Sequence, residues 1–98
     1  MYGYLQRKAI EESPENGKEE KFDSWLEKNG CPKTKSWIRL NNGKPKIPQD
    51  CTLQTYIRNR IHHPENTLNE AFSKDDIETS IKEMIEIAKK LQEHKDGH

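Results

Sequence analysis

The final quarter of the sequence carries its apolar residues at the spacing of one helical stripe, and this pattern constrains the fold most. From Ile77 to Leu91 apolar residues recur mainly at intervals of three or four, and charged residues occupy most positions between them. Ser73 followed by Asp76 forms a capping box, and acidic residues in the first turn suit the positive end of the helix dipole. The pattern therefore predicts a helix over residues 74–92 that buries one face.

Three further helices are expected upstream of this one. Residues 2–12 and 18–28 each place apolar side chains on one side of a short helix. Another helix begins after a cap at Asp50 or Thr52 and must end before Pro64, because the residue before a proline is pushed out of the helical region. Helices therefore dominate the predicted fold.

The segment 34–48 interrupts the helical pattern. It contains Asn42-Gly43, a strong signal for a tight turn, and it is rich in basic residues. Pro45 and Pro48 disfavour a regular strand on the returning arm. We therefore predict a single all-α domain over residues 1–98, a small bundle of about four helices with a short basic hairpin or loop insertion.

The supply of core residues is small. Ile, Leu, Phe and Val together account for 17 of the 98 residues, while the formal net charge is zero, which argues against disorder. A domain of this size is often marginal alone and commonly needs a partner surface. No apolar run approaches the roughly 20 residues of a membrane span, and the N-terminus lacks a signal-peptide core. We expect a cytoplasmic protein that does not bind membranes.

Two cysteines, Cys31 and Cys51, are too few for a disulfide scaffold. A zinc site formed by both cysteines with His62 and His63 is formally possible. The spacing of the two cysteines fits no common zinc-ligand pattern, so ordinary reduced thiols are favoured. We expect no metal site and no cofactor.

The zero net charge hides a basic middle segment. Residues 31–63 carry a net charge of +6, whereas residues 1–30 carry −2 and residues 64–98 carry −4. Such a segment can attract phosphate groups, although the three segments could equally neutralise one another within the fold or across a dimer. If the segment binds a nucleic-acid backbone, its lysines would steer that backbone, namely Lys33, Lys35, Lys44 and Lys46.

The residues most suited to chemistry crowd around the expected end of the helix before Pro64. They are two arginines, an amide and two adjacent histidines: Arg58, Asn59, Arg60, His62 and His63. Arginine presents a planar fork that matches phosphate oxygens, and histidine exchanges protons near neutral pH. A neutral histidine could remove the proton of an RNA 2′-hydroxyl, and an arginine could stabilise the charge that builds on the attacked phosphate.

Helix geometry leaves both histidines as candidates. Arg58 and His62 are four residues apart and share a helix face. His63 precedes Pro64 and should have left the helix, so its ring can swing back over the helix end.

Arg58-Asn59, then three intervening residues, then His63 resembles the R-N-x-x-x-H motif of the HEPN superfamily (higher eukaryotes and prokaryotes nucleotide-binding domains). The resemblance implies an all-helical domain that pairs with a second copy to form one composite cleft. It also implies an RNA-binding or metal-independent RNA-cleaving effector of a bacterial toxin or phage-defence system, with tRNA and an antitoxin as possible partners. Carried over by position, Arg58 and His63 would be catalytic and Asn59 would position them, with Arg60 and His62 assisting RNA binding.

A second interpretation does not involve catalysis. The stretch 56–66 followed by an acidic-capped helix also resembles the C-terminal tails of defence-type ATPases, in which case the chain is a fragment that serves oligomerisation or partner docking. Arg58 and Arg60 would then be the cationic end of a helix, which the helix dipole favours. His62 and His63 would be a cap and a packing residue.

Overall fold

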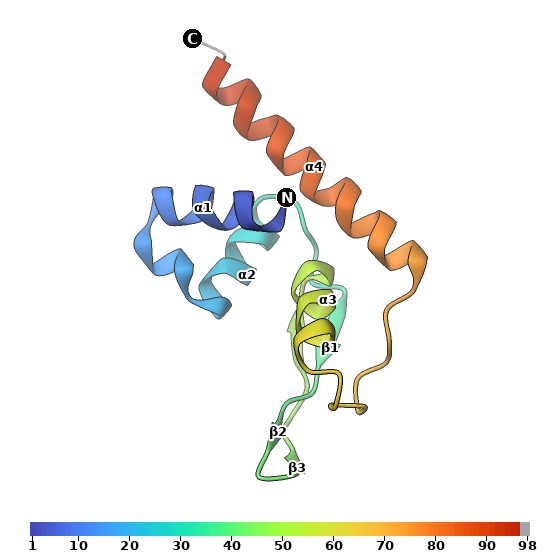
Figure 1. Cartoon of the computed structure of the whole chain (residues 1–98). Coiled ribbons are helices and arrows are strands. Elements are labelled where there is room, and N and C mark those ends of the chain that lie inside the picture. The colour runs from blue at the N-terminus through green and yellow to red at the C-terminus, as the bar shows by residue number, and fades with distance from the viewer. Residues whose placement is uncertain (97–98) are drawn as a thin grey trace.

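The computed structural model describes the backbone of residues 1–96 and the side chains of residues 1–92. Helices make up most of the chain, and a long hairpin of short strands separates the second helix from the third (Figure 1). In chain order the elements are α1 (Tyr2–Glu12), a 3-10 turn η1 (Pro14–Gly17), α2 (Glu19–Lys28), β1 (Lys35–Trp37), β2 (Leu40–Asn41), β3 (Lys44–Pro45), β4 (Gln49–Cys51), α3 (Leu53–His62) and α4 (Lys74–Asp96).

The prediction of an all-α fold was wrong, because the described chain is mixed α/β. Strand β1 pairs antiparallel with β4, and β2 pairs antiparallel with β3, so the insertion forms two small sheets along one hairpin. Asn42 and Gly43 adopt positive φ values of 54° and 78°, the backbone of a turn whose twist matches that of the flanking strands. Pro48 lies in the gap between β3 and β4, so the prolines divide the returning arm into two strands without preventing the pairing.

The helix predictions are confirmed with small shifts at their ends. The Thr52 side chain caps α3 by accepting a hydrogen bond from the Thr55 amide at 3.2 Å, while Asp50 belongs to β4. The capping box of α4 forms in both directions, with Ser73 N–H donating to Asp76 and Asp76 N–H donating to the Ser73 hydroxyl. Helix α4 runs beyond its predicted end at residue 92.

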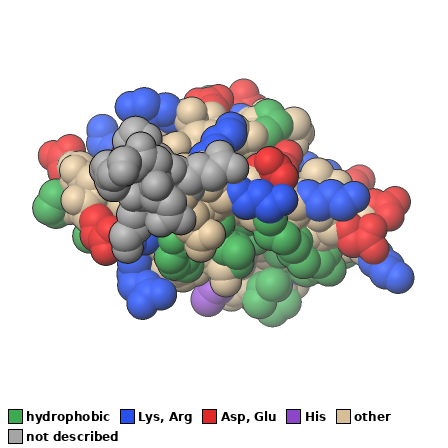
Figure 2. Space-filling view, turned by 90° about the horizontal axis from the view of Figure 1, so that it is seen from above, with side chains coloured by type: hydrophobic (Ala, Val, Ile, Leu, Met, Phe, Trp, Pro, Cys, Tyr) green, Lys and Arg blue, Asp and Glu red, His purple; other side chains and the backbone are tan. Residues whose placement is uncertain are grey.

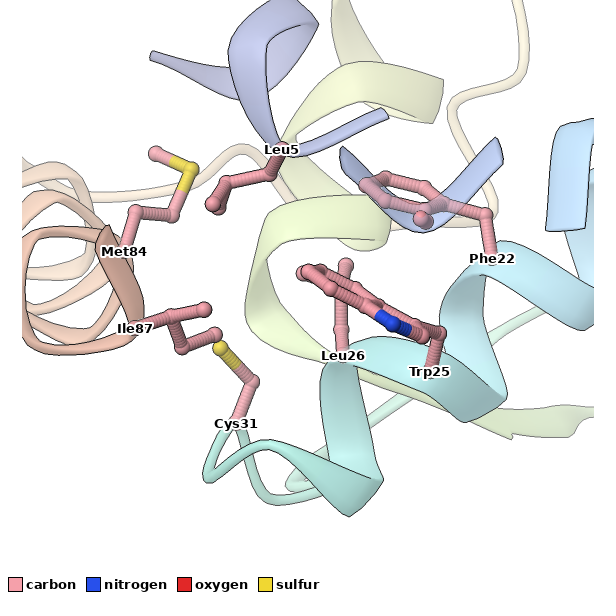
Figure 3. Packing of buried hydrophobic residues seen from close by; sticks show 8 residues of the cluster. Leu5, Phe22, Trp25, Leu26, Cys31, Met84 and Ile87 are labelled. Atoms are coloured by element: carbon pink, nitrogen blue, oxygen red, sulfur yellow. The ribbon is translucent and has the colours of Figure 1, made fainter. Parts of the chain in front are cut away.

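The main core lies where α4 crosses α1 and α2 (Figure 3). Its buried side chains come from both ends of the chain, so α4 closes the core that the first two helices begin. Phe22 and Trp25 stack in this core, and the Trp25 indole N–H donates to the Glu12 carboxylate. The cluster comprises Leu5, Ala9, Phe22, Trp25, Leu26, Cys31, Met84 and Ile87.

Only part of the predicted apolar stripe on α4 is buried. Met84 and Ala88 face the core, whereas Ile77 and Ile81 remain 39% and 45% exposed. Figure 2 shows hydrophobic side chains gathered along the lower edge of the molecule in that view. The first turns of α4 therefore carry an uncovered apolar face.

A buried carboxylate joins α2 to the start of α3. Asp23 is 6% exposed, and its Oδ1 accepts hydrogen bonds from the Thr52 amide (3.2 Å), the Thr52 hydroxyl (2.7 Å) and the Thr55 hydroxyl (2.6 Å). Lys33 Nζ lies 3.8 Å from the other carboxylate oxygen. Charge-assisted hydrogen bonds are among the stronger ones in proteins, so this cluster fixes the position of α3 relative to α2.

The loop after α3 is pinned to the hairpin by two asparagine side chains. Asn69 accepts from the Ile38 amide at 2.8 Å and donates to the Ile38 carbonyl at 2.9 Å, while Asn66 donates to the same carbonyl at 2.8 Å. The Tyr56 hydroxyl adds a third tie by donating to the Glu70 carbonyl at 2.6 Å. These amide groups occupy the place of a partner strand at Ile38.

Candidate functional site

A cavity of about 430 Å³ lies at the C-terminal end of α3, between that helix end, the hairpin and the first turn of α2. We call it the α3 cavity. The residues that matter for its chemistry are two arginines, two histidines, an amide and a carboxylate: Arg39 and Arg58, His62 and His63, Asn59 and Glu65. Arg39 belongs to the hairpin, and Arg58 and both histidines belong to α3 and its C-cap.

The end of α3 brings four of these groups together. Arg58 and His62 are one turn apart on the helix, and His63 forms its C-cap with a φ of −129° and a ψ of 62°, outside the helical region. The amide of His63 still donates to the Asn59 carbonyl at 2.9 Å, so the cap stays close to the last turn. Pro64 accounts for the change of direction, as the sequence predicted.

A carboxylate lies next to the His63 ring. His63 Nδ1 and Glu65 Oε1 are 3.5 Å apart, and both side chains are exposed. A carboxylate beside Nδ1 favours the tautomer that leaves Nε2 free to accept a proton, and it helps to orient the ring. Glu65 was not singled out from the sequence, although its place two residues after a histidine in a proline turn is the signal that could have found it.

Two guanidinium groups contribute to the lining. Arg58 is half-buried, with its guanidinium carbon 5.8 Å from the centre of the Tyr2 ring. Burial raises the pKa of Tyr2, and the charge of Arg58 opposes that rise. Arg39 reaches the cavity from the hairpin and pairs with Glu19 across a distance of 3.8 Å. Sequence reasoning missed Arg39 because no local motif connects the hairpin to α3.

Two asparagines are the most confined polar groups of the cavity, since Asn66 is 5% exposed and Asn59 is 7% exposed. Within the described residues, Asn66 Oδ1 is buried without a hydrogen-bond partner. Buried amide groups are normally hydrogen-bonded, so an unpaired amide oxygen that lines a cavity is suited to bind a ligand there.

The other residues predicted to bind nucleic acid lie elsewhere. Arg60 does not line the cavity, and its Nη1 donates to the Pro64 carbonyl at 3.1 Å. Lys33 is paired with Asp23, and Lys35 lies 3.8 Å from Asp76 and over the Tyr56 ring. The remaining two lysines project from the hairpin as exposed side chains, Lys44 and Lys46.

The two cysteines are separated between two buried clusters. Cys31 belongs to the main core, and Cys51 packs with Trp37 and Tyr56. Burial raises the pKa of each thiol to about 12, so both are protonated and unreactive near neutral pH. Within the described part of the chain, no three His, Cys, Asp or Glu side chains converge as a metal site.

Across the same described residues, no helix is long and apolar enough to cross a bilayer. No protein-family model, no curated protein and no solved structure matches this chain.

Proposed function

We propose that this chain binds RNA in the α3 cavity and cleaves its phosphodiester backbone without a metal ion. The proposal is carried by one observation: two guanidinium groups, a confined amide and an imidazole next to a carboxylate line a single cavity, contributed by Arg39, Arg58, Asn59, His63 and Glu65. Guanidinium forks match phosphate oxygens, and an imidazole can act as a general base near neutral pH.

In the proposed reaction, His63 Nε2 takes the proton of the ribose 2′-hydroxyl. The 2′-oxygen forms a bond to the adjacent phosphorus, the bond from phosphorus to the 5′-oxygen breaks, and that oxygen leaves with a proton from a protonated His62 or from water. Arg58 and Arg39 stabilise the charge that develops on the phosphate oxygens. The products are a 2′,3′-cyclic phosphate and a 5′-hydroxyl.

The short motif that resembles the HEPN superfamily supports the same residue roles for Arg58, Asn59 and His63. The all-helical domain that this resemblance implied is not the fold of this chain, so the proposal depends on the chemistry of the cavity. In this proposal the protein acts on RNA in the cytoplasm, as an effector of a bacterial toxin or phage-defence system.

The test is incubation of the protein with a tRNA pool in the presence of EDTA. We expect cleavage by the wild type, a loss of about 10²- to 10⁴-fold in His63→Ala, and a loss of about 10²- to 10³-fold in Arg58→Ala. Arg7→Ala is the matched control, because Arg7 is an exposed arginine of α1 outside the cavity. Circular dichroism of each variant checks that the fold is retained.

The chemistry of the products gives an independent readout. New 5′-ends should be phosphorylated directly by polynucleotide kinase, and a DNA oligonucleotide of the same sequence should stay intact because it lacks the 2′-hydroxyl. Cleavage of both RNA and DNA, or cleavage that survives in both active-site variants, would contradict the proposal.

A second candidate function, pairing with another copy of this chain, is favoured by the apolar face of α3 and α4. A groove of about 290 Å³ between these helices is lined by Ile57, Ile61 and Met84, and Ile61 is 62% exposed. An uncovered face of this kind on so small a core is typical of an interaction surface. We call it the α3–α4 groove.

The charges of α4 suit a second copy as the occupant. The first turns of α4 carry exposed acidic residues, and a later turn carries an exposed lysine, so two antiparallel copies would oppose unlike charges: Asp75 and Glu78 against Lys90. Because Arg58 and His62 line both the groove and the α3 cavity, the second copy would lie directly beside the proposed site.

Sedimentation of the wild type and of Ile81→Asp tests this pairing. We expect a dimer that becomes a monomer in the variant, whereas Ile47→Asp should leave the dimer intact, since Ile47 is 86% exposed on the hairpin. Most stable dimers have dissociation constants below about 100 μM. A wild type that stays monomeric up to that concentration contradicts the pairing.

A further inference from the structure

A second cavity, of about 410 Å³, adjoins the first on its α2 side. We call it the α2 cavity. The two cavities have four lining residues in common, which come from α2, the hairpin and α3: Glu19, Trp37, Arg39 and Asn59. The Arg39–Glu19 ion pair lies at this boundary, and both of its side chains are substantially exposed.

The lining of the α2 cavity is more acidic than that of the α3 cavity. Its lining includes four carboxylates, and two of them already have partners, since Asp23 binds Thr52, Thr55 and Lys33 and Glu19 pairs with Arg39. The two carboxylates that remain are exposed residues on different elements, Glu20 on α2 and Asp50 on β4. Asp50 accepts one hydrogen bond, from Ser36.

These carboxylates do not converge as a metal site in the described part of the chain, so they act as separate hydrogen-bond acceptors. A phosphate group would be repelled by them and attracted to the arginines of the neighbouring cavity. The boundary itself holds Asn59, which is 7% exposed and lines both cavities, so its amide can contact a ligand that extends across them.

We propose that the α2 cavity binds the base that belongs to the phosphate in the α3 cavity, and that it selects guanine. This inference rests on the proposed function and names the nucleotide that the site prefers. An ionised carboxylate can only accept hydrogen bonds, and it can accept two in parallel. On its Watson–Crick edge guanine presents two adjacent donors, N1–H and the 2-amino group. Adenine, cytosine and uracil each place an acceptor beside their donor, which a carboxylate repels.

Binding of 3′-mononucleotides tests the proposal without requiring cleavage. By titration calorimetry we expect 3′-GMP to bind at least about tenfold more tightly than 3′-AMP, 3′-CMP or 3′-UMP, since one bidentate contact discriminates by roughly that factor. Glu20→Gln and Asp50→Asn should together reduce this preference to within about twofold. Glu86→Gln is the matched control, because Glu86 lies on α4 outside both cavities and pairs with Lys89.

The cleavage sites in RNA provide the second arm. Equal binding of the four mononucleotides, together with metal-independent cleavage after every base, would overturn the guanine subsite and leave the proposed ribonuclease standing. Guanine-selective binding that is lost in the double variant supports the subsite even if the protein cleaves no RNA. A preference for guanine that survives in the double variant would also overturn the assignment to Glu20 and Asp50.

Discussion

Removing the Asp23 carboxylate should destabilise the fold by about 3 kcal/mol. Asp23→Ala deletes the acceptor of three hydrogen bonds at a site that is 6% exposed. Each bond to a charged acceptor contributes about 1.5–3 kcal/mol, so simple addition would give about 4.5–9 kcal/mol. That sum is too large, because the donors can partly rearrange.

The two threonine hydroxyls have alternative partners once the carboxylate is gone. Thr52 Oγ1 lies 3.3 Å from Thr55 Oγ1 and already accepts from the Thr55 amide, so the two hydroxyls can bond to each other. The Thr52 amide has no such alternative and is left buried and unpaired, at a cost of about 1–3 kcal/mol. With the lost charge-assisted bonds, the expected total is about 3 kcal/mol. A domain of this size unfolds with about 5–15 kcal/mol, so the variant should still fold.

Urea unfolding followed by circular dichroism measures this change. With a slope of about 1 kcal/mol/M, the midpoint should fall by roughly 3 M in Asp23→Ala. Asp23→Asn keeps one acceptor and should lose about half as much, and Asp50→Ala, which removes an exposed carboxylate, should change stability by under about 0.5 kcal/mol. If Asp23→Ala lies within 0.5 kcal/mol of the wild type, the reasoning about a charged joint between α2 and α3 is refuted.

Three further predictions follow from the same contacts. Because the pKa values of Cys31 and Cys51 are raised, the native state keeps thiol protons that the unfolded chain releases above pH 9. The free energy of unfolding should be unaffected below pH 9 and should fall by about 1.4 kcal/mol per thiol for each pH unit above it. Urea unfolding, compared with the double alanine variant, measures this change. Asn69→Ala removes two hydrogen bonds to the hairpin backbone and should lower the free energy of unfolding by about 2 kcal/mol, measured by thermal unfolding. Asn66→Ala removes one and leaves the Ile38 carbonyl bonded to Asn69, so its loss should be smaller. An equal loss of stability in both variants would contradict these roles of the two asparagines. Glu65→Gln weakens the contact that orients the His63 ring and should lower kcat about tenfold with KM unchanged. A change confined to KM would show that the carboxylate acts in binding alone.

The helices were predictable because their signals are local. Capping groups such as Ser73 and Thr52 mark helix starts through bonds to residues three positions away, and Pro64 ends α3 through a clash with its immediate neighbour. The same locality explains why Arg58 and His62 could be paired from their spacing alone.

The strands and the second half of the site depend on distant contacts. The hairpin is held at Ile38 by asparagine side chains about 30 residues further along the sequence. These hydrogen bonds bring Arg39 to the end of α3. The exposed half of the α4 stripe was also unpredictable, since periodicity marks Ile77 and Met84 equally and does not say how far a partner helix extends.

The asparagine ties at Ile38 have a consequence for motion. The loop that carries Glu65 has few apolar anchors, so its order depends on amide groups bonded to the hairpin backbone at Ile38, between β1 and β2. If either the loop or the hairpin backbone at Ile38 opens, the other loses the same hydrogen bonds. Both should therefore lose amide-hydrogen-exchange protection together, as one cooperative unit with a single opening free energy. Substrate release would then require no separate gate, because the loop and the hairpin that line the proposed site open in the same fluctuation.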